Sequence, residues 1–148
     1  MVRRYVRWGI SGVVSGVVLV LCAHAVLRAK TDEPDPAQLI GVWRGTSTCS
    51  DRVAAPACHD ETVVYEFTAG SKNGTVHWAA DKVVNGERAR MGDLELTYDK
   101  TEACWKAEFS SPRVKSVWRL VVEGNHLTGT ARLLPGNETV RKVDARKE

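Results

Sequence analysis

The chain has 148 residues, of which 43% are hydrophobic and 26% are charged, so it is long enough for one globular domain. Its 12 glycines and 5 prolines are too few for a collagen-like or low-complexity protein. The net charge of +3 comes from Arg3, Arg4 and Arg7, because the other 18 basic residues and all 18 acidic residues follow from Val26 onward. A domain without net charge lacks the basic surface that phosphate-backbone binding requires, so no nucleic-acid partner is expected.

The first 25 residues are predicted to direct export. A short basic end precedes an apolar run from Trp8 to Leu27, which is the order that the translocation machinery recognises. Small residues at Ala23 and Ala25 favour cleavage after Ala25, so residues 1–25 are predicted to be a signal peptide. An uncleaved hydrophobic helix that anchors the protein is the alternative, since about 20 apolar residues span a bilayer. Both interpretations predict an extracytoplasmic domain, periplasmic or secreted, that contacts a membrane only through this segment.

Residues 26–38 are predicted to be a solvated linker, because the acidic stretch 31–38 contains two prolines. Residues 39–148 form the predicted domain. Their apolar residues recur with period two, which favours strands over helices. About eight strands are expected, at residues 41–49, 62–68, 75–84, 93–98, 103–109, 115–122, 127–133 and 139–146.

The connections between these strands are short, and Asn85-Gly86 is typical of a tight hairpin turn. Short connections make neighbouring strands antiparallel, and eight such strands most simply close into an up-and-down barrel. Closure also removes the exposed sheet edges that invite aggregation. The predicted fold class is therefore all-β, with a two-sheet sandwich as the alternative.

The tripeptide Gly41-Val42-Trp43 at the start of the first strand resembles the Gly-x-Trp signature of the lipocalin and calycin superfamily. The chain is shorter than typical lipocalins, and in length it is similar to smaller ligand-binding barrels such as avidin-like proteins. The resemblance implies a barrel that binds a small apolar ligand, with Trp43 at the closed end and a late-strand arginine packed across it. Arg141 is the candidate arginine, because it shares a face with Val143 and Ala145.

Large aromatic side chains fall on the predicted strands in unusual number. Ligand pockets are mostly apolar, so these side chains are candidates to line a cavity for a small apolar molecule. The candidate ligand-binding residues are Tyr65, Trp78, Trp105 and Trp118. The alternative is that they fill the barrel, since the interior of an eight-stranded barrel is just wide enough for side chains. A filled barrel would act as a structural or protein-interaction module of the cell envelope.

Three cysteines lie in the predicted domain. Cys49 and Cys58 flank the long connection after the first strand, and a disulfide between them is expected in an exported protein. Cys104 is then left over, with an outward phase relative to Trp105. Three cysteines allow three single pairings, so Cys104 is either a free thiol or bridged to one of the other two.

The sequence predicts neither a metal site nor catalysis. Cys58, His59, Asp60 and Glu61 are adjacent in the chain, so their side chains cannot all point at one ion, and no second Cys/His pair has ligand spacing. No nucleophile-elbow, P-loop, zinc-protease or dinucleotide motif is present. The domain is therefore expected to be non-catalytic, with no cofactor.

Overall fold

The structure is a computed structural model that describes residues 33–148. The predicted signal peptide or anchor, its hydrophobic helix and most of the predicted linker lie outside the described residues. Among the residues from 33 onward, no helix has the length and apolar character needed to cross a membrane. The last residues of the predicted linker form a short 3-10 helix, η1 (Pro36–Gln38). Asp35 caps the start of this helix, and its side chain accepts a hydrogen bond from the Ala37 amide.

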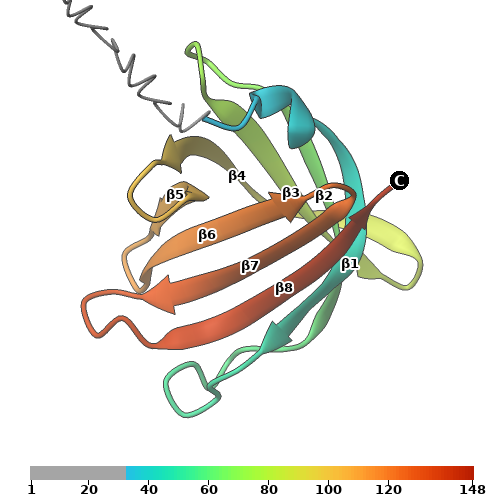
Figure 1. Ribbon diagram of the computed structural model, residues 1–148. Coiled ribbons are helices and arrows are strands. Elements are labelled where there is room, and N and C mark those ends of the chain that lie inside the picture. The colour runs from blue at the N-terminus through green and yellow to red at the C-terminus, as the bar shows by residue number, and fades with distance from the viewer. Residues whose placement is uncertain (1–32) are drawn as a thin grey trace, which may run out of the picture. The chain divides into compact units, whose positions relative to one another are not determined.

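Eight strands follow, and each is antiparallel to the next (Figure 1). They are β1 (Gly41–Cys49), β2 (Glu61–Ala69), β3 (Val76–Val84), β4 (Glu87–Asp99), β5 (Cys104–Ser110), β6 (Lys115–Glu123), β7 (His126–Leu133) and β8 (Thr139–Lys147). Because β8 also pairs with β1, the sheet closes into an up-and-down barrel. This confirms the all-β barrel and excludes the sandwich.

Alternation along the strands separates a dry interior from a wet exterior, as the sequence predicts. All eight strands contribute side chains to the packed interior. The interior residues include Leu39, Trp43, Val63, Tyr65, Phe67, Val76, Trp78, Leu96, Trp105, Leu120, Leu127, Val143 and Ala145, each at most 4% exposed. Strands β1 and β8 approach closely at Gly45, where a Cβ would lie 2.0 Å from the Asp144 carbonyl oxygen.

Strand β4 begins six residues before the predicted strand at 93–98, because a β-bulge interrupts the alternation. The register shifts between Ala80 and Asp81 of β3, so that Ala80 faces Gly92 while Asp81 faces Arg90. An extra residue at a bulge reverses which side chains face inward. As a result Leu94 and Leu96 point into the barrel, whereas Arg90 points outward to Asp81. Without the bulge, all three even-numbered residues would lie on the same face of the strand.

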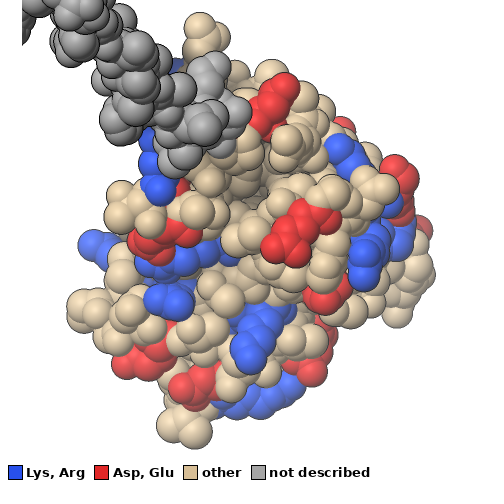
Figure 2. Space-filling model, in the orientation of Figure 1, with Lys and Arg blue, Asp and Glu red and all other residues tan. Residues whose placement is uncertain are grey.

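Asp81 is the most buried carboxylate on the outside of the barrel, at 4% exposed. Its oxygens accept hydrogen bonds from Arg88 Nε at 2.7 Å and from Arg90 Nε at 2.5 Å. Burial opposes the charged form, but these two hydrogen bonds outweigh it and lower the pKa of the Asp81 carboxyl. On the face shown in Figure 2, basic and acidic side chains lie intermingled.

The junction between β4 and β5 is the shortest in the barrel. Only residues 97–99 of β4 pair with residues 104–106 of β5, whereas every other pair of neighbouring strands shares six or more residue pairs. Within the described chain, residues 87–96 of β4 therefore pair with β3 alone and residues 107–110 of β5 pair with β6 alone. On this side of the barrel, most of the backbone hydrogen bonds that would join β4 to β5 are missing.

Trp43 lies at the end of the barrel nearest η1. It is fully buried, and its Nε1 donates to the carbonyl of Leu39 at 2.8 Å. The cation that packs on its ring is Lys147, whose Nζ lies 5.3 Å from the ring centroid. The expectation that Arg141 packs across Trp43 is wrong, because the register places Lys147 opposite Trp43 and Arg141 opposite Cys49, at the other end of β1.

Candidate functional site

A cavity of about 450 Å³ occupies the barrel at the end opposite Trp43. Residues from all eight strands and from the β1–β2 and β5–β6 connections surround it. The lining residues are Ser47, Ala54, Ala55, Pro56, Ala57, Cys58, Glu61, Tyr65, Trp78, Ala80, Met91, Gly92, Asp93, Leu94, Phe109, Val114, Ser116, Trp118, Ala131, Leu133, Val140 and Arg141. Most of these side chains are apolar, so the cavity suits a molecule with little polar surface.

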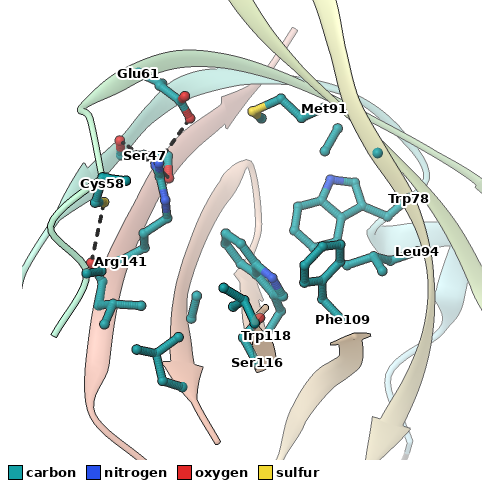
Figure 3. A pocket seen from close by; sticks show the side chains of 18 of the residues that line it. Ser47, Cys58, Glu61, Trp78, Met91, Leu94, Phe109, Ser116, Trp118 and Arg141 are labelled. Carbon is teal, nitrogen blue, oxygen red and sulfur yellow. Dashed lines mark hydrogen bonds and ion pairs between the residues drawn. The ribbon is translucent and has the colours of Figure 1, made fainter. Parts of the chain in front are cut away.

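Aromatic rings form one side of the cavity (Figure 3). Trp78 is the centre of this group, with its ring centroid 4.9 Å from that of Tyr65 and 5.2 Å from that of Trp118, both edge to face. Phe67 stacks behind Trp78 at 6.0 Å and supports it from the core. Edge-to-face and stacked pairs hold rings in defined orientations, so this side of the cavity is rigid.

A compact polar cluster forms the opposite side (Figure 3). The guanidinium of Arg141 lies 3.2 Å from a carboxylate oxygen of Glu61, and both side chains are less than one-fifth exposed. Arg141 also donates to the Ser47 hydroxyl at 2.9 Å and to the carbonyl of His59 at 3.1 Å. The charge of Arg141 is therefore balanced by Glu61, and both terminal nitrogens of its guanidinium bond to groups of the protein itself.

Tyr65 connects the aromatic side to the polar side. Its side chain is 1% exposed, and burial raises the pKa of its hydroxyl to about 12, although a hydrogen bond with Ser47 and the charge of Arg141 oppose this shift. The phenol consequently stays neutral at every physiological pH. It contributes an uncharged polar group to a largely apolar cavity.

The β1–β2 connection forms part of the wall at the mouth of the cavity. The Cys49–Cys58 disulfide closes it, with Cα atoms 6.0 Å apart, which confirms the predicted pairing. The Ser50 amide donates to the carbonyl of Val140 at 2.9 Å, so the connection is also tied to β8. These two attachments hold residues 54–58 against the cavity.

The rim of the cavity is apolar and open to solvent beside the short β4–β5 junction. Met91 of β4 is 42% exposed, Phe109 of β5 is 39% exposed and Val114 of the β5–β6 connection is 42% exposed. All three line the cavity. A small apolar molecule could therefore reach the interior past these side chains.

Three of the four candidate ligand-binding residues come together here. Tyr65, Trp78 and Trp118 line the cavity, but Trp105 does not. Trp105 is 3% exposed and packs in the core against Tyr98, with ring centroids 5.5 Å apart. The strands tilt across the barrel, so a shared inward face does not place residues at the same height.

The sequence did not predict several of the residues that line the cavity. The β1–β2 connection, Met91 and Gly92 carry no period-two signal, because a connection has none and the bulge reverses the pattern in β4. Ser47 and Glu61 are polar residues that face inward next to Arg141. The inward phase of Arg141 was the one signal that could have pointed to this cluster.

Cys104 carries no bridge, and it shares the outward side of β5 with Lys106. It is nevertheless only 3% exposed. This burial, followed by the nearby charge of Glu102, raises the pKa of the thiol. The residues from 33 to 148 contain no group of three or more His, Cys, Asp or Glu side chains arranged to hold a metal ion.

No protein-family model matches the chain, and no curated protein is significantly similar to it. The fold is an eight-stranded antiparallel barrel compatible with a lipocalin-like fold.

Proposed function

We propose that this protein is an exported, lipocalin-like domain that binds a small apolar molecule in its barrel and does not catalyse a reaction. The observation that carries the proposal is the cavity of about 450 Å³. It falls within the range of about 300–1,000 Å³ that ligand pockets occupy. A barrel packed solid with side chains, the basis of the alternative structural or interaction module, would leave no such volume.

The chemistry of the lining supports a non-catalytic role. Arg141 and Glu61 neutralise each other, and the three histidines of the described residues, His59, His77 and His126, do not line the cavity. A nucleophile beside a base would be needed for acyl or group transfer. The polar groups instead stabilise the wall of an apolar pocket.

The disulfide is consistent with an extracytoplasmic location, since such bonds persist in oxidising compartments. A periplasmic or secreted domain is the proposal, either released after cleavage or held at the membrane by the N-terminal segment. Binding of a small apolar ligand in this compartment needs no cofactor. No nucleic-acid partner is proposed.

The test is to fill the cavity and measure binding. Ala131 lines the cavity and is 2% exposed, so Ala131→Leu places three additional carbon atoms in the open volume. The full chain is titrated with a panel of small apolar probes, and tryptophan emission is recorded. We expect saturable binding of at least one probe, weakened about tenfold or more in Ala131→Leu.

The matched control is Thr130→Leu, an adjacent position on the outward side of β7. This variant should bind as the wild type does. Absence of saturable binding across the panel, or equal affinities for wild type and Ala131→Leu, would contradict the proposal.

A further inference from the structure

The cavity contains a polar atom that the protein leaves without a partner. The indole Nε1 of Trp78 is buried and has no hydrogen-bond acceptor among the described residues. The side chain is 1% exposed, and its ring forms part of the cavity wall. In Figure 3 the nitrogen lies on the edge of the ring nearest Met91, not on the side that packs against Trp118.

An indole N–H can donate but cannot accept, so only an acceptor atom can satisfy it. A buried donor without a partner costs free energy, and most buried donors in proteins are paired. Trp43 illustrates the ordinary case, since its Nε1 donates to the Leu39 carbonyl. Trp78 lacks the equivalent protein acceptor where its ring lines the cavity.

The charges of the lining define the rest of the ligand. Arg141 is the single Lys or Arg among the lining residues, and Glu61 and Ser47 already occupy it. Asp93 also borders the cavity, but its carboxylate is 47% exposed and pairs with the outward-pointing Arg90 at 2.6 Å. An anionic ligand would find no free cation here and would be buried beside the Glu61 carboxylate, which is unfavourable.

We infer that the ligand is a neutral, largely apolar molecule with one hydrogen-bond acceptor, such as a ketone, ester or ether oxygen, that binds Trp78 Nε1. This inference rests on the proposed function and specifies the chemical class of its ligand. The acceptor restores the missing hydrogen bond, while the surrounding rings bury the apolar body. A free carboxylate is disfavoured in the same cavity.

Three probes of the same shape separate these contributions. They are 2-acetylnaphthalene, which has a neutral acceptor, 2-isopropylnaphthalene, which has none, and 2-naphthoate, which is charged at pH 7. Affinities for the full chain are measured by calorimetry. We expect 2-acetylnaphthalene to bind about 5- to 10-fold more tightly than 2-isopropylnaphthalene, the range of one net hydrogen bond, and 2-naphthoate to bind most weakly.

Two variants of the same cavity assign the preference to Trp78. Trp78→Phe keeps a ring but removes the donor, so it should abolish the preference for the acetyl over the isopropyl probe. Trp118→Phe removes the other cavity indole, whose nitrogen is not among the buried unpartnered atoms, and should keep the preference. If the preference is absent in wild type or persists in Trp78→Phe, the inference is overturned.

Glu61→Gln tests the part of the inference that concerns charge. It leaves Arg141 without its carboxylate partner, so the affinity for 2-naphthoate should rise about tenfold or more relative to the affinity for 2-acetylnaphthalene. Wild-type protein that binds 2-naphthoate more tightly than 2-acetylnaphthalene would contradict it. Equal binding of the two neutral probes overturns this inference alone, whereas no binding of any probe overturns the proposed function as well.

Discussion

Individual polar residues decide what the barrel interior can accept. Arg141 and Glu61 lie opposite the aromatic side of the cavity and pair with each other, and Arg141 also donates to the Ser47 hydroxyl and to the carbonyl of His59. Removing one member of a buried pair leaves the other charge uncompensated, which is strongly unfavourable. The pair therefore stabilises one wall of the cavity rather than offering a charge to a ligand.

Tyr65 should make stability depend on pH above the physiological range. An unfolded tyrosine ionises near pH 10, whereas burial raises the pKa of Tyr65 to about 12 in the folded protein. Below pH 10 both states hold the proton and the residue has no effect. Between pH 10 and 12 only the unfolded state loses it, so the free energy of unfolding falls, by roughly 1 kcal/mol at pH 11.

Urea unfolding of wild type and Tyr65→Phe at pH 9 and pH 11 measures this contribution. The fall between the two pH values should be roughly 1 kcal/mol smaller in Tyr65→Phe. Tyr98→Phe, at a half-buried position, keeps Tyr65 and should retain the wild-type fall. The same fall in all three proteins would show that Tyr65 is not shielded from solvent.

At the scale of single elements, the β1–β2 connection affects both the stability of the protein and ligand binding in the cavity. Residues 54–58 form part of the cavity wall, and the Cys49–Cys58 disulfide holds them there. Replacing both cysteines by alanine should lower the free energy of unfolding by about 2–3 kcal/mol, because the unfolded chain gains freedom. The loosened wall should also weaken binding of any ligand that the cavity takes.

Thermal unfolding with and without reductant checks this prediction. Wild type and Cys104→Ala should both lose stability on reduction, since Cys104 takes no part in the bridge. The Cys49→Ala/Cys58→Ala variant should start lower and stay unchanged by reductant. Reductant sensitivity that disappears in Cys104→Ala would mean that the pairing differs from that described.

The elements also show what the sequence could predict and what it could not. Alternation is a property of each strand alone, so the interior faces of β1, β2, β3 and β6 were predictable. The first half of β4 was not, because the bulge at Asp81 reverses the alternation where Arg90 turns outward. A strand at the rim of a cavity also needs no continuous apolar face, so residues 87–92 carried no hydrophobic signal.

The position of Arg141 depends on the pairing register between strands, which the alternation of apolar residues does not specify. Its inward face was predictable, but its height along β8 follows from pairing with Cys49 rather than Trp43. The same limit applies to Trp105, which faces inward below the cavity and packs in the core. The disulfide was predictable because it depends on the length of one connection, a local property of the chain.

For the whole molecule, the barrel divides into a packed end and a hollow end. Trp43, Leu39 and Trp105 fill the packed end, while Trp78, Trp118 and Arg141 surround the cavity at the other. The short β4–β5 junction and the exposed rim residues Met91 and Phe109 leave this second end accessible from the side. Stability and binding are thus assigned to different halves of one closed sheet.

The most direct test of this division is an NMR titration of the indole N–H signals in the full chain. With 2-acetylnaphthalene, the signals of Trp78 and Trp118 should shift together and saturate, whereas that of Trp43, bonded to Leu39 at the packed end, should not move. Signals that stay unchanged, or a saturable shift of Trp43 without Trp78, would contradict a ligand cavity at this end of the barrel.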